Sequence, residues 1–181
     1  MFKTILHEHE IMRIKNIYKY EKDQRIHLLS LCLQKIMINE IFSIDYHKII
    51  IKKNEWGKPY FENTLGFDFN ISHDKDFIVG TCAYAKIGID VMCINNEIKI
   101  KIFNNLDKDL LNKIKKSENS QLELIKLWTL IESYFKAIGI GLRFDFNNLI
   151  INDYTIQYLD FDKLKYKYIY FENYITCICT V

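Results

Sequence analysis

The chain of 181 residues carries 25 Lys and Arg against 23 Asp and Glu, which gives a formal net charge of +2. That balance is too mild to indicate nucleic-acid binding, and a content of 49% hydrophobic and 14% aromatic residues excludes a disordered protein. The length suffices for one compact unit with a sizeable core, or for two small lobes that share one.

The cysteines and the hydropathy of the chain predict a soluble cytoplasmic monomer. The five cysteines form no C-x-x-C pair and stand among apolar neighbours, which favours reduced core thiols over a disulfide framework or a zinc site. No stretch approaches the ~18 uninterrupted apolar residues of a membrane helix. Charge interrupts the N-terminal MFKTILHEHE before the apolar run of a signal peptide can form.

The first predicted elements are a short strand and a long helix. His7 and His9 alternate like neighbours on one face of a strand, so they either seat a metal ion or are merely solvated. Residues 20–42 show helical spacing, with apolar positions at Ile26, Leu29, Leu33, Ile36, Met37 and Ile41. Lys22 and Arg25 at the start of this helix either hold a phosphate or are solvated.

A sharp turn follows the predicted strand at residues 48–53. In the sequence E-W-G-K-P-Y-F, Lys58 stands between Gly57 and Pro59, the chain's single proline. Glycine and proline in such a turn release backbone groups from strand pairing, so that these groups can face a ligand, although an ordinary surface loop shows the same pattern.

The next predicted strand, residues 67–72, ends at a polar cluster. It delivers Ser72, His73 and Asp74 to a strand end, a place where side chains often contact a substrate. A histidine at this position alone would more often have a structural role.

Two further strands are predicted at residues 77–85 and 86–92. In the second, period-two alternation places Gly88, Asp90 and Met92 on one face, opposite Ile87, Ile89 and Val91. An aspartate between isoleucine and valine in the middle of a strand is costly to bury unless a cation compensates its charge, and a metal ion would do so.

The second half is predicted to contain lysine-bearing helical segments at 95–116, a core helix at 122–138 and alternating strands at 150–181. The core helix has its apolar stripe at Leu124, Leu127, Ile131, Tyr134 and Ile138. Glu132 and Lys136 lie one turn apart near its end, which Gly139 marks. They are either an ordinary surface ion pair or an acid and a base at a functional site.

Three motifs in this order resemble the Sfp-type 4'-phosphopantetheinyl transferases. They are WGKPYF, FNISHD, and IGID followed after 41 residues by the Glu132 of WTLIESYFKAIGIGL. The resemblance covers roughly residues 20–142, and the last motif is also similar to that of the eukaryotic aminoadipate-semialdehyde-dehydrogenase type of transferase. It implies a pseudo-twofold α+β fold with lobes at 1–92 and 93–181, each a long helix on an antiparallel sheet, and an active site between them.

The resemblance also implies the reaction and its participants. The 4'-phosphopantetheine arm would move from coenzyme A to a serine of an acidic apo carrier protein, with Mg²⁺ as cofactor and adenosine 3',5'-bisphosphate as product. Asp90 and Glu132 would hold the magnesium ion, and either Glu132 or a metal-bound water would take the serine proton. Lys136 would stabilise or protonate the departing group.

For coenzyme A, the resemblance assigns three sets of contacts. His73 and Lys136 would contact the diphosphate, and Ser72 would line the nucleotide site. The turn of Gly57, Lys58 and Pro59 would hold adenine and its 3'-phosphate. By position, Lys22 and Lys53 match basic residues that contact the 3'-phosphate in some members.

Two residues depart from the family pattern. Met92 stands where many members carry a second acid, so we predict that Asp74 completes the magnesium shell, with a water molecule as the alternative. Ile131 stands where a lysine commonly precedes the glutamate, and it falls on the apolar stripe of the helix. The chain is also short for this family, and we expect part of the N-terminal segment to be missing. These departures motivate the rival hypothesis of a non-catalytic relative that binds coenzyme A or a carrier protein, although Asp90, Glu132 and Lys136 are all retained.

Overall fold

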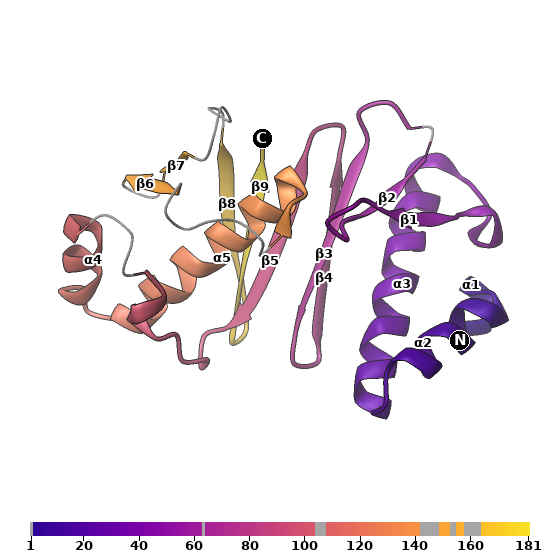
Figure 1. Ribbon diagram of the computed structural model, residues 1–181, viewed down its shortest axis with the longest axis horizontal. Helices are drawn as coiled ribbons and strands as arrows, with labels where there is room; N and C mark the ends of the chain where they lie inside the picture. The colour runs from indigo at the N-terminus through magenta and orange to yellow at the C-terminus, as the bar shows by residue number, and fades with distance from the viewer. Residues whose placement is uncertain (1, 63, 104–107, 142–148, 153–154, 158–163) are drawn as a thin grey trace.

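The computed structural model of this protein describes residues 2–62, 64–103, 108–141, 149–152, 155–157 and 164–181. In chain order the elements are α1 (Phe2–Ile5), α2 (Glu8–Ile17), α3 (Glu21–Phe42), the 3-10 turn η1 (Tyr46–Lys48), β1 (Ile51–Lys53), β2 (Pro59–Phe61), β3 (Asp68–Asp74), β4 (Phe77–Ala83), β5 (Ile87–Cys93), the 3-10 turn η2 (Ile100–Phe103), α4 (Lys108–Lys115), α5 (Ser120–Ile138), β6 (Ile150–Asn152), β7 (Thr155–Gln157), β8 (Lys165–Phe171) and β9 (Tyr174–Thr180). Helices thus pack on small antiparallel sheets, as predicted for the class (Figure 1). No helix among the described residues is long and apolar enough to cross a membrane.

The N-terminal half is built on α3, which confirms the helix predicted at 20–42. One side of α3 packs on the β3–β4 hairpin, and α1 and α2 cover another side (Figure 1). The predicted apolar stripe is therefore only partly right, since Ile26 is buried but Ile41 is 46% exposed. Leu28 and Cys32 are buried against the two short helices instead, because a helix packed on two sides has no single apolar stripe.

The C-terminal half is a three-stranded sheet in the order β5-β9-β8, with α5 packed across β5 and β9. The helix matches the prediction closely. It ends at Gly139, which has a φ of +85° and caps it, and its stripe residues Leu124, Leu127, Ile131 and Tyr134 are almost completely buried. Strand and helix approach closely at Gly88, where an added Cβ would lie 1.9 Å from the Ser133 carbonyl oxygen.

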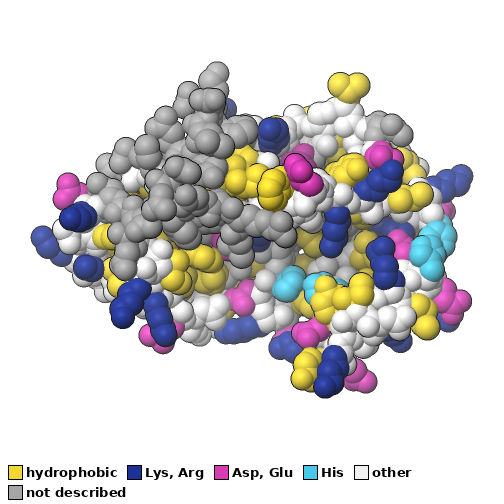
Figure 2. Space-filling model, viewed as in Figure 1, with side chains coloured by type: hydrophobic (Ala, Val, Ile, Leu, Met, Phe, Trp, Pro, Cys, Tyr) yellow, Lys and Arg dark blue, Asp and Glu magenta, His cyan; other side chains and the backbone are white. Residues whose placement is uncertain are grey.

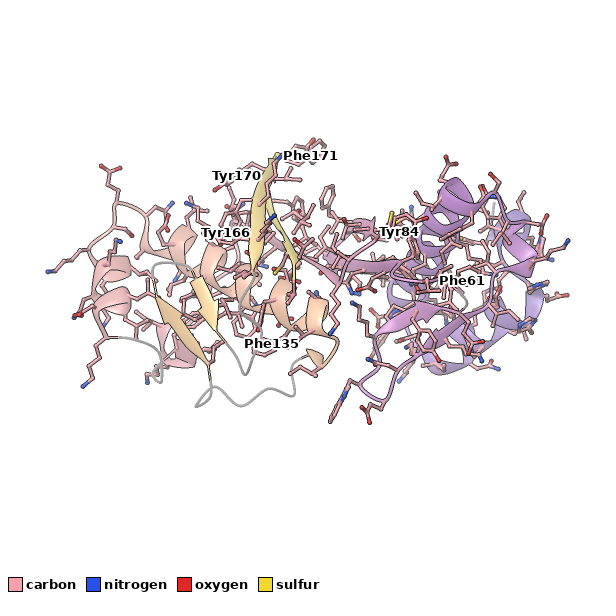
Figure 3. The ribbon with its side chains drawn as sticks, turned by 90° about the horizontal axis from the view of Figure 1, so that it is seen from above. Phe61, Tyr84, Phe135, Tyr166, Tyr170 and Phe171 are labelled. Atoms are coloured by element: carbon pink, nitrogen blue, oxygen red, sulfur yellow. The ribbon has the colours of Figure 1, made fainter. Side chains whose placement is uncertain are left out.

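The two halves meet where β3 runs beside β5 (Figures 1 and 3). These strands belong to different hydrogen-bonded sheets, so polar side chains of β3 bind the backbone of β5 in place of a strand ladder. The Asp68 carboxylate accepts from the Ile87 N–H, the Asn70 amide oxygen from the Ile89 N–H, and the Asp74 carboxylate from the Cys93 N–H. Alternate β3 residues thus join the halves.

Several predictions of detail differ from the structure. His9 lies in α2 and His7 is its N-cap residue, so the predicted strand is wrong; Glu10 closes the cap by accepting from the His7 N–H. The strand predicted at 48–53 is shortened to β1, because η1 occupies its start. The division into lobes at 1–92 and 93–181 stays a prediction; its boundary lies at the end of β5, which pairs with β9 over its whole length. The pseudo-twofold relation of two lobes stays a prediction.

Candidate functional site

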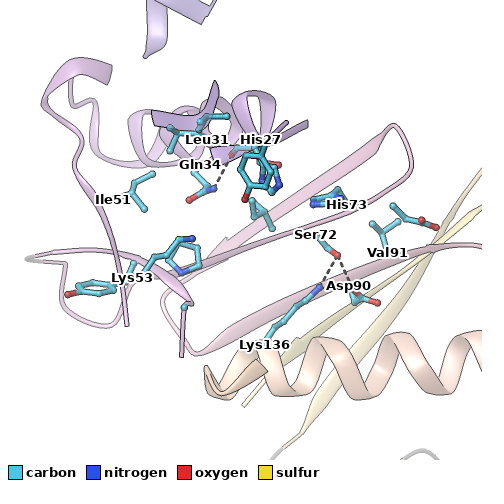
Figure 4. A pocket seen from close by; sticks show the side chains of 18 of the residues that line it. His27, Leu31, Gln34, Ile51, Lys53, Ser72, His73, Asp90, Val91 and Lys136 are labelled. Atoms are coloured by element: carbon cyan, nitrogen blue, oxygen red, sulfur yellow. Dashed lines mark hydrogen bonds and ion pairs between the residues drawn. The ribbon is translucent and has the colours of Figure 1, made fainter. Parts of the chain in front are cut away.

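A cavity of about 1000 Å³ lies between the halves of the molecule. Its walls come from α2 and α3, from β1 and the turn that follows, and from β3, β5 and α5. On the face shown in Figure 2, basic, acidic and histidine side chains gather around the middle of the molecule, where the halves meet. Figure 4 shows the lining side chains that extend into the cavity from these elements.

Three predicted site residues form one hydrogen-bonded cluster at the α5 end of the cavity (Figure 4). The Lys136 ammonium donates to Asp90 Oδ1 at 2.6 Å and to Ser72 Oγ at 2.9 Å, and the Ser72 hydroxyl donates to the same Asp90 oxygen at 2.8 Å. Asp90 is only 6% exposed. Burial raises the pKa of its carboxyl group, against the opposing effects of Lys136 and Ser72.

Glu132 lines the same cavity and carries a strongly perturbed carboxyl group. It is 8% exposed, and burial together with the nearby Asp90 raises its pKa to about 7, with Lys136 acting in the opposite direction. Among the described residues no side chain donates a hydrogen bond to it. Two carboxylates therefore share one ammonium, and this arrangement leaves negative charge that a further cation would compensate.

The carboxylates of Asp90 and Glu132 are hard oxygen donors, and they suit Mg²⁺. Among the described residues no group of three or more His, Cys, Asp or Glu side chains could hold a metal ion, so Asp74 does not form a three-carboxylate site with Asp90 and Glu132 in this conformation. Magnesium in phosphoryl-transfer sites is commonly bound by one or two carboxylates, with waters and substrate phosphates completing its shell. Asp90 Oδ2 and the Glu132 carboxylate are free of the cluster's hydrogen bonds, so the donor set fits this kind of site.

His73 and Asp74 also line the cavity. The exposed His73 ring lies edge-on to His27, with ring centroids 5.8 Å apart. Asp74 Oδ2 accepts from the Cys93 N–H at 2.7 Å and from Asn96 Nδ2 at 2.8 Å. One Asp74 oxygen therefore already binds the end of β5, and the other remains for a ligand.

The predicted glycine-proline turn lies at the cavity and is organised by Asn54, a residue that the sequence pattern did not reveal. Asn54 Oδ1 accepts from the Lys58 N–H at 2.8 Å, and its Nδ2 donates to the Gly139 carbonyl at 3.0 Å. Gly57 has a φ of +91°, which glycine adopts without strain, and both Gly57 and Pro59 line the cavity. The turn is thereby tied to the end of α5.

The Lys58 side chain points away from the cavity that the turn lines. Its ammonium pairs with Asp68 and donates to the Ile87 and Ala137 carbonyls, each at 3.1 Å. Burial lowers the pKa of Lys58, and Asp68 opposes that shift. The three ammonium hydrogens thus hold together the turn, β5 and the end of α5, and in this conformation none remains for a phosphate.

The basic residues predicted for a phosphate separate into two groups. Lys53 lines the cavity, together with Lys52 and Arg13, which sequence reasoning missed; the Lys52 ammonium is already paired with Glu62 at 2.7 Å. Lys22 instead pairs with Asp76 at 3.4 Å and lines a separate depression at the start of α3. The local sequence does not separate the lysines that line the cavity from Lys22, because each stands at a position where a solvent-exposed side chain is expected.

One stripe of α3 also lines the cavity and was missed. Its residues recur at three- and four-residue steps and are His27, Ser30, Leu31 and Gln34. The His27 ring stacks on Tyr18 with centroids 3.8 Å apart. Polar residues at helical spacing were the available signal, but the apolar pattern of the same helix hid it.

Comparisons with known proteins identify relatives of this chain. Residues 1–84 match the family described as 4'-phosphopantetheinyl transferase, N-terminal, and residues 86–179 match the 4'-phosphopantetheinyl transferase superfamily. The chain is 31% identical over 173 residues to the 4'-phosphopantetheinyl transferase gsp of Aneurinibacillus migulanus, covering 91% of this chain and 72% of that protein.

More distant relatives include the 4'-phosphopantetheinyl transferase psf-1 of Bacillus pumilus, 28% identical over 131 residues, which covers 70% of this chain and 55% of the relative. The L-aminoadipate-semialdehyde dehydrogenase-phosphopantetheinyl transferase of Rattus norvegicus is 28% identical over 149 residues, with 73% of this chain and 48% of that protein covered. The chain thus spans about half the length of several relatives that it matches.

Proposed function

This chain belongs to the 4'-phosphopantetheinyl transferase superfamily, and we propose that it transfers the 4'-phosphopantetheine group of coenzyme A to a serine of an apo carrier protein. The observation that carries the proposal is the meeting of Asp90, Glu132 and Lys136 with Ser72 and His73 in one cavity. These residues come from three elements of both halves of the molecule, and the cavity is large enough for an extended nucleotide.

The reaction exchanges one phosphorus–oxygen bond for another. The serine oxygen of the carrier attacks the phosphorus that bears the pantetheine arm, and the bond to the second phosphate breaks to release adenosine 3',5'-bisphosphate. Glu132 accepts the serine proton. In the metal-free protein burial and Asp90 raise its pKa to about 7, and a cation bound beside it would lower that pKa and keep the carboxylate ionised to act as a base. Lys136 would stabilise the charge that grows on the departing phosphate, and its hydrogen bonds to Asp90 and Ser72 beside Glu132 support this role.

Asp90 and Glu132 would hold Mg²⁺, and either Asp74 or a water molecule would complete its shell; Asp74 would have to move toward the pair to bind the ion, since the three carboxylates are not grouped in this conformation. When bound, the ion neutralises the diphosphate and so stabilises the negative charge of the transition state. His73 would donate to the diphosphate from the adjacent position on β3. On β5, two residues after Asp90, Met92 supplies only a thioether, and sulfur is a poor ligand for magnesium.

The nucleotide half of coenzyme A would occupy the part of the cavity between α2, α3 and the turn. Gly57 and Pro59 would cover adenosine, and Lys53 with Arg13 and Lys52 would bind the 3'-phosphate, since a dianion in a cleft needs several fixed cations. Lys58 would hold the turn in place from the side opposite the cavity, through its hydrogen bonds to the Ile87 carbonyl of β5 and the Ala137 carbonyl of α5.

The carrier protein would be acidic, and α4 offers a surface for it. Lys113, Lys115 and Lys116 are exposed at the end of this helix, where positive charge can guide an acidic partner to the site. Reversing these lysines to glutamate should then weaken the apparent affinity for the carrier and flatten its dependence on salt.

A direct test incubates the protein with coenzyme A, magnesium and a panel of apo carrier proteins, and reads each carrier by intact mass. We expect a gain of one phosphopantetheine group on at least one carrier. Lys136→Ala should abolish the gain, whereas Lys126→Ala, a lysine on the same helix that pairs with Glu123, should not. Coenzyme A binding without any mass gain across a broad panel would instead favour the non-catalytic relative that Met92 suggests.

A further inference from the structure

Two polar side chains on the α3 wall of the cavity, Ser30 and Gln34, have hydrogen-bonding groups that no other described residue satisfies. Ser30 is 4% exposed, and its hydroxyl has no hydrogen-bond partner within the described part of the chain. A buried hydroxyl that gives up water and gains no partner destabilises the fold. Ser30 lines the cavity, but its Oγ has less than 1 Å² of accessible surface, so a ligand there supplies the missing partner once the hydroxyl rotates toward it.

Gln34 lies one turn beyond Ser30 and is 8% exposed. Its Nε2 donates to the Ser30 carbonyl at 3.2 Å, so one amide hydrogen is committed. No other hydrogen bond of Gln34 forms among the described residues, which leaves the Oε1 acceptor and the second amide hydrogen. Figure 4 shows Gln34 reaching from α3 toward the cavity, near Ile51. The bond to Ser30 fixes the amide, so that it cannot exchange its oxygen and nitrogen.

Apolar side chains also line the cavity. They are Ile14 and Ile17 from α2, Leu31 from α3, Ile51 from β1 and Pro59 from the turn. Apolar walls around one acceptor and two donors suit a flat heteroaromatic ring whose edge offers an amine beside a ring nitrogen. Glutamine pairs with adenine in this way, through the exocyclic amine and a ring nitrogen.

We propose that Gln34 and Ser30 read the base edge of the nucleotide and select adenine. This inference rests on the proposed function, because coenzyme A supplies the adenine. Gln34 Oε1 accepts from the exocyclic amine, and the second Gln34 amide hydrogen or the Ser30 hydroxyl donates to a ring nitrogen. A base that carries a keto oxygen in place of the exocyclic amine would bring two acceptors, that oxygen and Gln34 Oε1, into contact. The Gln34 amide cannot rotate to offer its donor instead without losing its bond to Ser30.

The test compares binding of adenosine 3',5'-bisphosphate and inosine 3',5'-bisphosphate by calorimetry. These probes differ at the base, where inosine carries oxygen in place of the amine. The wild-type protein should bind the adenosine compound at least about tenfold more tightly, as expected when a buried acceptor loses its donor. Gln34→Leu should bring the two affinities within about twofold of each other, whereas Gln34→Glu keeps an acceptor and should keep the preference.

Ser30→Ala separates a binding role from a structural one. It should weaken binding of the adenosine compound severalfold without lowering the urea midpoint of unfolding, because the hydroxyl has no partner to lose in the free protein. Equal wild-type affinity for both compounds, or an unchanged preference in a folded Gln34→Leu protein, would overturn the assignment. If coenzyme A is still transferred to a carrier in that case, only the base-reading role fails; if neither coenzyme A nor the nucleotides bind, the proposed function fails with it.

Discussion

Replacing Gly88 by alanine should both destabilise the protein and impair the site, because this glycine sets the position of α5. An added Cβ would lie 1.9 Å from the Ser133 carbonyl oxygen and 2.4 Å from the Ala137 nitrogen. Both are backbone atoms, so no side chain can rotate away. Restoring even a 3.0 Å contact to the Ser133 oxygen requires a shift of 3.0 − 1.9 = 1.1 Å between strand and helix.

The size of the effect follows from this shift. Overpacking a core typically costs about 1–3 kcal/mol, and a rigid backbone clash belongs at the upper end, about 3 kcal/mol. Glu132 and Lys136 directly precede the two contacted residues and move with them. A displacement of about 1 Å in reacting groups lowers turnover by about 100-fold.

Gly80→Ala is the matched control. Its Cβ would meet Met37 Sδ at 2.8 Å and Leu33 Cδ2 at 3.1 Å, both at the far ends of flexible side chains on α3. We expect a loss below about 1 kcal/mol and near-normal activity. Urea unfolding followed by circular dichroism measures stability, and carrier mass gain measures turnover. If the Gly88→Ala and Gly80→Ala proteins unfold at the same urea concentration and turn over equally, the argument for a backbone contact is wrong.

Three other predictions concern the site. The folded-state pKa of Glu132 is raised from 4.5 to about 7, so its contribution to stability is present below pH 4.5 and lost as pH rises through 7. In metal-free buffer the free energy of unfolding of Glu132→Gln should therefore exceed that of the wild type by about 3 kcal/mol at pH 8 and equal it near pH 4. Urea-unfolding curves that coincide for the two proteins at both pH values would contradict this prediction. Coenzyme A should bind at least about tenfold more tightly than dephospho-coenzyme A, and Lys53→Ala but not Lys22→Ala should reduce that ratio, with calorimetry as the measurement. Asp74→Ala should raise the magnesium concentration for half-maximal activity, and adding Met92→Glu should partly restore it, whereas an unchanged requirement would leave water as the third ligand.

Local sequence patterns were enough to predict the main elements. Residues 20–42 and 122–138 were identified as helices because apolar positions recur at helical steps along them, and α3 and α5 occupy almost these ranges. Gly139 marked the end of α5 because a left-handed cap favours glycine. The motifs around Ser72 and Asp90 were likewise found from residue order alone, and the cavity brings these residues together.

The partners of the charged side chains were decided only by tertiary structure. Lys58 and Lys53 both stand beside the turn in sequence, yet Lys58 is drawn inward by Asp68 and two carbonyls, while Lys53 faces the cavity. Asp74 is likewise partly committed to the end of β5. Such choices depend on groups up to 79 residues away in the chain, as between Lys58 and Ala137, and local periodicity carries no information about them. Local periodicity therefore determined the long helices α3 and α5 but not the short elements at the N-terminus, and packing between the two halves determined which side chains line the cavity.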